Sequence, residues 1–376
     1  MSWSTQRLPE ELQTTEFARQ IDRLRRELGG GLIDMTESNP TRGFPAHRRR
    51  LAEHLKAAAA RLGETAYEPT PKGLLMAREA VADYYGSRGR SVPPRQICLT
   101  ASTSEAYGWL GKLLADPGGE VLVPTPSYPL FDHLFRAECL EAVPYRYRYD
   151  GAWHLDVGHL REGIESCERP AAIVSVSPNN PTGHRLESGE FEALAELSRW
   201  HDLPLIVDEV FLDYGHRSED AASVLGEVER ASLPERPLTF VLSGLSKVAA
   251  APGAKLAWIA VDGPPRLRGE ALERLEFLAD SYLSVSTVTQ LATPDILGAI
   301  PPFQRGLRRR LASNLESLDS ALEAVPSCER YPVDAGWYAV VRMPSFIDEE
   351  RFVLELLEEP DRKSTRLNSS HRLRSR

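Results

Sequence analysis

The chain has 376 residues, 42% of them hydrophobic and 26% charged, which is typical of a globular protein of about two domains. Its net charge of −9 argues against nucleic acid or an anionic membrane as the main partner. The sequence has no apolar stretch long enough to cross a bilayer, and its N-terminus lacks the apolar core of a signal peptide. The four scattered cysteines and nine histidines show no metal-ligand spacing. We therefore expect a cytoplasmic protein with reduced thiols and no metal site.

The N-terminal segment is predicted to form an amphipathic helix over residues 8–28, ended by the three glycines at 29–31. The apolar positions at helical spacing are Leu12, Phe17, Ile21, Leu24 and Leu28.

From about residue 95 onward, short β-rich runs alternate with helical stretches. The runs are Ile97–Thr100, Glu120–Val123, Ala171–Ser177, Leu203–Asp208, Thr239–Ser243 and Leu256–Val261, and the helical patterns include residues 103–115, 187–201 and 265–282. Several runs are almost entirely apolar, as in strands buried on both faces. The alternation predicts an α/β domain, with a mostly parallel sheet flanked by helices. Right-handed crossovers would place the loops that follow the strands along one edge, where ligands bind.

The C-terminal part predicts a smaller α+β domain. It contains a long helical pattern near 303–325, a strand at Gly336–Met343 and a helix at Asp348–Glu358. The expected division is an N-terminal segment, 1–44, that packs on the small domain, a large domain, 45–283, a small domain, 284–360, and a basic tail, 361–376. The tail carries five Arg and one Lys against one Asp, and part of it resembles translated sequencing-adapter sequence. We exclude it from the predicted fold and expect the small domain to be truncated.

The first of four polar loops that follow predicted strands contains Ser102, Thr103 and Ser104 at the start of a helix. Small hydroxyl side chains at this place can simply cap the helix. The backbone N–H groups and the helix dipole also favour an anion, so the loop is a candidate phosphate site.

The second and third loops place an amide and a carboxylate at strand ends. The segment Ser177–Gly183 contains turn-forming dipeptides. Its Asn180 could also donate to a phenolate-type oxygen. Asp208 ends an apolar strand, where it could cap a helix or pair with a base. If buried, it could instead keep a pyridine nitrogen protonated and make the ring an electron sink.

The fourth loop contains Lys247, which follows the strand Thr239–Ser243. Lysine side chains are usually solvated, but the neighbours of this one are small or apolar. Desolvation lowers the pKa of an ammonium group and leaves a neutral amine available to condense with an aldehyde. Eight residues later, Lys255 offers a second cation suited to a phosphate.

The order of these elements is a hydroxyl cup, then N-N-P-T-G, then D-E-V, then S-x-x-S-K followed by P-G-x-K. In this order the chain resembles the fold-type I pyridoxal-phosphate (PLP)-dependent aminotransferases of the class I/II group, from about residue 30 to 358. The resemblance implies that Lys247 is the Schiff-base lysine, that Asp208 pairs with the pyridine nitrogen, and that Asn180 bonds the ring 3-oxygen and contacts the substrate.

The same resemblance implies further contacts. It assigns the cofactor phosphate to Ser102, Thr103, Ser104, Ser243 and Lys255. It places Tyr128 on the face of the cofactor ring. Tyr67 would reach the phosphate of a neighbouring subunit, which implies a homodimer with shared active sites.

The chain departs from the family pattern at several positions. Phe211 stands where many members have a tyrosine that bonds the ring oxygen, and the nearby Tyr214 occupies a different position. Lys255 replaces the commoner Arg. Ser38, a candidate substrate contact, stands where relatives often have glycine. In many members an Arg of the small domain binds the substrate carboxylate. Arg342 lies in this domain but in no motif that matches the family, so no Arg can be assigned to this role.

The predicted function is transamination between an L-amino acid and a 2-oxo acid, with Lys247 moving the substrate proton. A carbon–sulfur β-lyase or a decarboxylase on the same fold is an alternative. A noncatalytic PLP-binding regulator is a more remote one, since about forty residues before the first motif leave little room for a DNA-binding domain. The amino donor stays open among aspartate, alanine and aromatic substrates.

Overall fold

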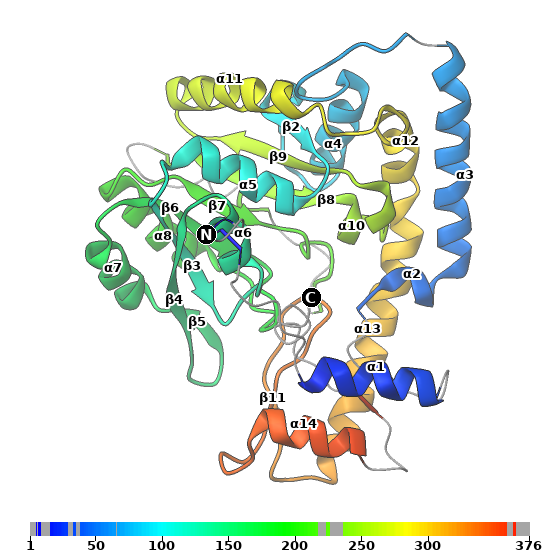
Figure 1. Cartoon of the computed structure of the whole chain (residues 1–376), viewed down its shortest axis with the longest axis vertical. Helices are drawn as coiled ribbons and strands as arrows, with labels where there is room; N and C mark the ends of the chain where they lie inside the picture. Colours follow the sequence, from blue (N-terminus) through cyan, green and yellow to red (C-terminus); the bar gives the residue numbers. More distant parts are fainter. Residues whose placement is uncertain are drawn as a thin grey trace.

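The computed structural model describes residues 5, 7–8, 16–28, 33–34, 38–64, 66–216, 223–225, 236–358 and 364–365. Within these residues the largest sheet has eight strands in the order β2-β9-β8-β7-β6-β3-β4-β5 (Figure 1). The strands are β2 (Ile97–Thr100), β3 (Glu120–Thr125), β4 (Glu141–Tyr149), β5 (Trp153–Leu155), β6 (Pro170–Val176), β7 (Leu205–Asp208), β8 (Thr239–Gly244) and β9 (Ala257–Asp262). The pairs from β8 through β4 are parallel, whereas β9 and β5 run antiparallel to their neighbours. The predicted α/β fold with a mostly parallel sheet is confirmed.

Helices cover both faces of this sheet (Figure 1). They are α4 (Leu75–Gly86), α5 (Thr103–Leu114), α6 (Phe131–Ala137), α7 (Val157–Ser166), α8 (Ser188–Trp200), α10 (Leu245–Val248), α11 (Pro265–Tyr282) and α12 (Thr287–Gly298), and α3 (Pro45–Arg61) packs on the outside of α12. Successive residues of one strand enter opposite cores. Leu205 and Val207 of β7 pack in the cluster of α3, α4, α7, α8 and α12, while Ile206 packs in the cluster of α5, α6 and α11. This two-sided burial explains why the central strands are apolar without alternation.

The sequence pattern missed the outer strand β4, because its polar and apolar residues alternate and only part of it is buried. The predicted strand Gly336–Met343 is wrong over most of its length. Only Val341–Arg342 (β11) forms a ladder, with Glu329–Arg330 (β10). Upstream, the backbone N–H groups of Ala335 and Gly336 donate to the carbonyls of Gly183 and Tyr214, at 3.0 and 2.9 Å. These hydrogen bonds hold the segment against the large sheet's loops, where it cannot continue a strand.

The remaining elements lie away from the sheet, at the lower part of Figure 1. They are α1 (Glu16–Leu28), β1 (Ile33–Asp34), α2 (Pro40–Gly43), α13 (Ile300–Glu323), α14 (Glu349–Glu358) and β12 (Ser364–Thr365). Phe17, Ile21 and Leu24 of α1 are buried against Leu357 of α14. The predicted N-terminal helix is thus described from Glu16 onward, while residues 9–15 and the glycines at 29–31 lie outside the described residues.

Two residues of the basic tail take part in the described structure. Strand β12 pairs in parallel with β1, at Ile33–Ser364 and Asp34–Thr365. The other tail residues lie outside the described part of the chain. Strand β12 also contacts α14, which packs against α1.

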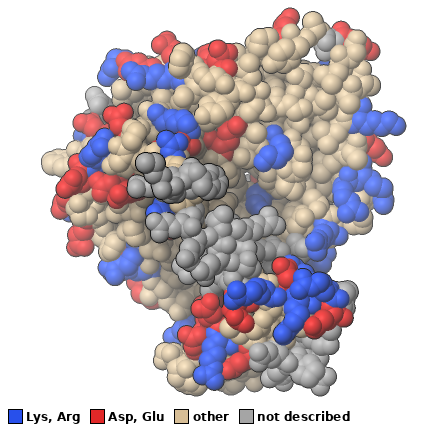
Figure 2. Space-filling model, in the orientation of Figure 1, with Lys and Arg blue, Asp and Glu red and all other residues tan. Residues whose placement is uncertain are grey.

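No helix among the described residues is long and apolar enough to cross a membrane. The same residues contain no group of three or more His, Cys, Asp or Glu side chains that could hold a metal ion. On the face seen in Figure 2, basic and acidic side chains are intermixed and do not form one broad basic area.

Candidate active site

The carboxyl ends of three parallel strands lie side by side in the middle of the large sheet. Val176 of β6 pairs with Asp208 of β7, which pairs with Leu242 of β8. The backbone N–H of Ser177 donates to the carbonyl of Asp208 at 2.9 Å, and that of Glu209 donates to the carbonyl of Leu242 at 2.8 Å. The loops that carry Asn180, Asp208 and Lys247 therefore leave the sheet at one edge, the usual ligand-binding edge of such sheets.

The other predicted loops reach the same edge through β9. Ala257, its first residue, pairs with Thr100 at the end of β2 and with Gly244 at the end of β8. The start of α5 and the turn that contains Lys255 consequently lie next to the end of β8. The fold thus brings the hydroxyl-rich loop, the amide, the carboxylate and both lysines to neighbouring strand ends.

Asp208 is a buried carboxylate with two hydrogen-bond donors. Burial raises its pKa to about 6, while the N–H of Val210, the hydroxyl of Tyr107 and the charge of Lys247 oppose the rise. Val210 donates to Oδ1 at 3.0 Å and Tyr107 to Oδ2 at 3.1 Å. Tyr107 was not among the site residues predicted from the sequence. Its position in the sequence could have indicated it. Tyr107 lies one helical turn after Thr103, on the face of α5 that enters the core.

Lys247 lies on the short helix α10, directly after β8. Its Nζ is 5.1 Å from the ring centre of Trp337 and 5.6 Å from that of Phe211. Burial lowers the pKa of this ammonium group, and the negative charge of Asp208 partly offsets the effect. An amine in these surroundings loses its proton more easily than a solvated lysine, as the sequence analysis expected. Trp337 was not among the expected site residues. The segment that contains it was predicted as a strand of the small domain, away from the strand ends that carry the site.

The loop after β6 contains two neighbouring amide side chains, Asn179 and Asn180, with different surroundings. Asn179 accepts a hydrogen bond from the Ser127 hydroxyl at 2.8 Å and donates to the carbonyl of Pro126 and to Thr182 Oγ1, both at 2.9 Å. It ties this loop to the one that follows β3. Asn180 is also buried, but its Oδ1 has no hydrogen-bond partner within the part of the chain that the structure describes. Asn180 is therefore the amide whose oxygen could still accept a hydrogen bond from a ligand.

The hydroxyl-rich loop both caps a helix and keeps donors for an anion. Ser102 Oγ accepts a hydrogen bond from the N–H of Glu105 at 3.1 Å, so Ser102 is the N-cap of α5. The N–H groups of Thr103 and Ser104 lie in the first turn, where a helix offers them no carbonyl. Ser104 is hydrogen-bonded to Tyr128, whose pKa burial raises to about 12. Tyr128 is thereby held beside this loop.

The other expected site residues are placed less tightly. Lys255 is exposed and adopts a left-handed backbone conformation, with φ of 54°. Tyr67 is 68% exposed, and Ser38 is half-buried. Arg342 forms an ion pair with Glu329 at 2.7 Å on the surface of the β10–β11 ladder. That pairing gives no support for Arg342 as a ligand for the substrate.

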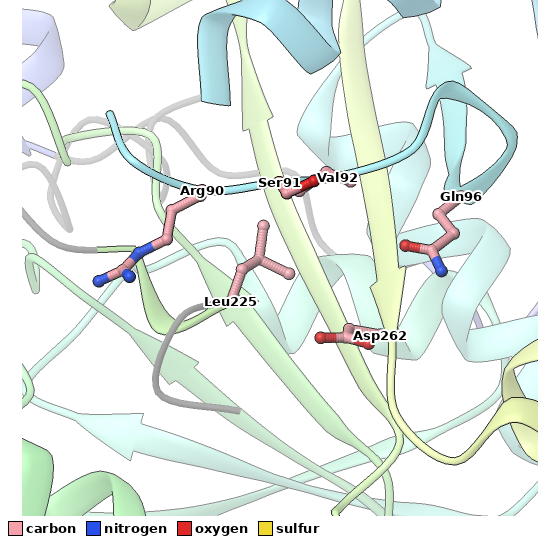
Figure 3. Close-up of a pocket in the computed structure, with 6 residues that line it drawn as sticks. All are labelled: Arg90, Ser91, Val92, Gln96, Leu225 and Asp262. Carbon is pink, nitrogen blue, oxygen red and sulfur yellow. The ribbon is translucent and has the colours of Figure 1, made fainter. Parts of the chain in front are cut away.

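A separate small cavity lies at the opposite edge of the sheet (Figure 3). Its lining residues are Arg90, Ser91, Val92, Gln96, Leu225 and Asp262. Asp262 pairs with Thr239, the first residue of β8, whereas Lys247 follows the last one. The cavity contains none of the expected site residues and is not part of the site described above.

Comparison with known proteins identifies the family. The family model described as aminotransferase class I and II matches residues 32–367. The chain belongs to this family. It is 30% identical over 228 residues to glutamate-pyruvate aminotransferase AlaA of Escherichia coli (strain K12), which covers 60% of this chain and 54% of that protein. It is 26% identical over 294 residues to tyrosine aminotransferase of Mus musculus, covering 76% of this chain and 63% of that protein. The chain thus matches between about half and two thirds of the length of these curated relatives.

Structural comparison supports the same fold. A single mutant of Thermus thermophilus aspartate aminotransferase aligns with a TM-score of 0.80 at 24% identity, over 100% of this chain and 93% of that one. At this level of identity the similarity concerns the fold alone.

Members of the aminotransferase class I and II family use PLP, and the residues at the strand edge fit this cofactor. Two buried polar atoms there, Ser243 Oγ and Asn180 Oδ1, have no protein partner among the described residues. A buried polar group without a partner is costly, and a polar ligand at this strand edge would satisfy both atoms. The amine of Lys247 and the carboxylate of Asp208 complete a set of groups that suits an aldehyde and a pyridine nitrogen.

Proposed function

We propose that this protein is a PLP-dependent aminotransferase that moves an amino group between an L-amino acid and a 2-oxo acid. One observation carries the proposal. The amine of Lys247, its pKa lowered by burial, and the buried carboxylate of Asp208 lie at adjacent strand ends, next to a helix N-terminus. A nucleophilic amine, a fixed negative charge and an anion site are the three groups that PLP requires.

In this proposal each residue has a defined part in holding the cofactor. Lys247 attaches it covalently, Asp208 holds a proton on the pyridine nitrogen, Asn180 bonds the ring oxygen and Tyr128 stacks on the ring. The phosphate contacts come from Ser102, Thr103, Ser104, Ser243 and Lys255. Because Ser102 already caps α5 through its oxygen, it would contribute its hydroxyl hydrogen as a donor.

The chain's own groups then account for the proton transfer. Bound PLP supplies an electron sink that weakens the bond to the substrate α-hydrogen. When Lys247 is not bound to the cofactor, its neutral amine could accept this proton from the substrate Cα and deliver it to the C4′ carbon of PLP. Trp337 and Phe211 keep the amine away from water and so favour its neutral form.

For the substrate, we propose that Ser38 and Asn180 contact the amino acid. The related proteins act, by their names, on glutamate and pyruvate or on tyrosine, so both acidic and aromatic amino acids are candidate donors here. The aromatic side chains of Phe211, Trp337 and Tyr338 pack together beside Lys247. They support including aromatic amino acids in any substrate panel.

We further propose a cytoplasmic homodimer with shared active sites. The 68% exposed side chain of Tyr67 supports a role in contacting a second subunit, and the four free cysteines support a reducing compartment. Mixing Tyr67→Phe and Lys247→Ala subunits tests the sharing. If active sites are shared, the mixture contains one site with both native residues and is more active than either parent variant.

We propose the domain division stated above, with segment 1–44, a large domain 45–283, a small domain 284–360 and a tail 361–376. The packing of α1 on α14 supports the contact between the N-terminal segment and the small domain. Helix α12 contacts α3 and α4. It would therefore connect the small domain firmly to the large one.

The experiment is PLP reconstitution followed by a panel of amino acids with and without 2-oxo acids. We expect a visible absorbance band that requires Lys247, and amino-group transfer that requires the 2-oxo acid. Borohydride reduction and peptide mass analysis should place the cofactor on Lys247. Release of pyruvate and ammonia without any amino acceptor would support the β-lyase instead. Absence of the band in the wild-type protein would refute PLP binding.

A further inference from the structure

The short helix that carries Lys247 ends at a left-handed residue, Ala250, whose N–H donates to the Lys247 carbonyl at 3.3 Å, while the N–H of Ala251 donates to the Leu245 carbonyl at 2.9 Å. Helix α10 has only four residues, and the last carbonyls of any helix lack intrahelical donors. The chain then turns at Ala250, whose φ of 48° is unfavourable for a residue with a Cβ atom and is usually adopted by glycine. Contacts from outside the helix therefore add to these backbone bonds in stabilising the strained position of Ala250.

Three side chains supply further donors, one for each of three successive carbonyls. The Tyr214 hydroxyl donates to the carbonyl of Lys247 at 2.6 Å. Gln304 Nε2 donates to the carbonyl of Val248 at 3.0 Å. His47 Nε2 lies 2.7 Å from the carbonyl of Ala249 and must carry the hydrogen, because a carbonyl oxygen only accepts.

The three donors come from elements far apart in the sequence. His47 is on α3, Tyr214 follows β7 and Gln304 is on α13. Ala250 fills the space between them, since its side chain is buried with Phe211, Tyr214 and Phe303. An alanine here packs in a cluster that a glycine would leave partly empty, which explains why the strained position is not glycine.

The donors are themselves held by further contacts. The ring of His47 stacks on Phe303, with centres 4.1 Å apart and planes 16° apart. Gln304 also donates to Asp213 Oδ2 at 2.7 Å, and Asp213 receives Arg88 Nε at 2.7 Å and the Tyr84 hydroxyl at 3.0 Å. His47 and Gln304 thus have fixed orientations before they meet α10.

From this arrangement we propose that Tyr214, Gln304 and His47 are positioning residues for Lys247. By holding the carbonyls of residues 247, 248 and 249, they fix the backbone from which the Lys247 amine projects. The inference rests on the proposed function, because it assigns these residues a purpose in presenting that amine. It also gives Tyr214 a contact different from the ring-oxygen bond that a tyrosine at position 211 would make.

The test compares two tyrosines that make the same kind of hydrogen bond. Tyr214→Phe removes the donor to Lys247. Tyr145→Phe removes an equally buried hydroxyl, which donates to the carbonyl of Val174 at 2.7 Å within the sheet. Both variants lose one tyrosine-to-carbonyl bond, and Tyr145→Phe also loses polar contacts with Ser175 and Tyr147. Tyr145→Phe should therefore be at least as destabilised, while only Tyr214→Phe should change Lys247.

The first measurement is made without PLP. The pH dependence of Lys247 acylation, followed by peptide mass spectrometry, reports the pKa of its amine. We expect that pKa to rise towards the ordinary lysine value in Tyr214→Phe, because a loosened helix lets the amine reach water, and to stay unchanged in Tyr145→Phe. In the PLP-loaded protein we expect kcat to fall about tenfold for Tyr214→Phe with little change in KM.

His47→Phe, which retains a ring to stack on Phe303, and Gln304→Met carry the same test if Tyr214→Phe does not fold. They are expected to shift the Lys247 pKa in the same direction. Identical labelling and kinetics for Tyr214→Phe and Tyr145→Phe would overturn the positioning role. A wild-type chain that takes up no PLP would instead refute the proposed function, and the labelling experiment separates the two results.

Discussion

The hydroxyl of Tyr107 donates a hydrogen bond to Oδ2 of Asp208 at 3.1 Å, and both side chains are buried. Burial alone would favour the neutral acid. A donor aimed at the carboxylate stabilises its ionised form and partly offsets that effect. Tyr107 thus helps to keep charged the group that is expected to hold a proton on the cofactor.

Removal of this donor in Tyr107→Phe is predicted to raise the pKa of Asp208 from its value of about 6. A lost hydrogen bond to a charged group, at about 1.5 kcal/mol, corresponds to about one pKa unit. Because PLP binding favours the carboxylate, PLP affinity should decline below about pH 6 in the wild type and below about pH 7 in the variant. Fluorescence titration of the cofactor across this range checks the shift. An unchanged midpoint would show that Tyr107 does not act on Asp208.

Replacement of Lys247 by alanine is predicted to abolish covalent attachment of the cofactor and to reduce transamination by about 10³-fold, since the proton-transfer group is lost. Lys255→Ala is the matched lysine variant. Lys255 is exposed and is expected to contact only the phosphate, so its loss should weaken PLP affinity and leave covalent attachment intact. Reduction with borohydride and mass analysis of the peptides distinguishes the two. Attachment that survives in Lys247→Ala would remove the basis of the proposed function.

Glu209 is predicted to make the cofactor-free protein less stable as the pH rises. Burial raises its pKa to about 7, although Ser223 and the N–H of Val224 donate to it. Its folded-state pKa exceeds the ordinary value of 4.5, so its contribution to stability is fully present below pH 4.5 and is lost as the pH rises through 7.

Glu209→Gln, which cannot ionise, tests this prediction. The free energy of unfolding of Glu209→Gln relative to wild type should increase between pH 5 and pH 8, by up to about 3 kcal/mol. Urea denaturation at both pH values measures the difference. Glu196→Gln is a suitable control, because Glu196 is exposed on α8. A difference that is constant with pH would mean that Glu209 titrates normally.

Gly183→Ala is predicted to destabilise the contact between the Asn180 loop and residues 333–335. Gly183 has φ of 71°, and an added Cβ would lie 2.6 Å from both the carbonyl oxygen of Ala335 and Cγ1 of Val333. The backbone strain and the overlap together should cost about 2–4 kcal/mol. Gly189→Ala, in α8 with open space around it, should be neutral or slightly stabilising. Equal thermal unfolding of the two variants would contradict the close contact.

The sequence was sufficient to predict the α/β class and the central strands, because strands buried on both faces form short apolar runs between helical patterns. The ends of β6, β7 and β8 were predicted within about two residues, which located Asn180, Asp208 and Lys247 at one edge. Strand β4 was missed for the converse reason. It lies near the edge of the sheet, is only partly buried, and so has no continuous apolar run.

The local sequence pattern gave a wrong strand prediction at one place where distant segments of the chain are in contact. The residues from Gly336 onward have the composition of a strand, yet hydrogen bonds to Gly183 and Tyr214 hold Ala335 and Gly336 and bring Trp337 next to Lys247. No local periodicity encodes such contacts, because Gly183, Tyr214 and Lys247 are distant in the sequence from residues 335–337.

The sequence by itself therefore determined the kind of fold and the chemical groups, since the polar residues that follow buried strands are adjacent to them in the chain. Only the tertiary structure decided what surrounds those groups. Tyr107 reaches Asp208 from another element, Trp337 lies near the Lys247 amine, and Tyr214 holds the carbonyl of Lys247. Their effects depend on burial and on hydrogen-bond geometry across the fold, which arise only when segments distant in the sequence pack together.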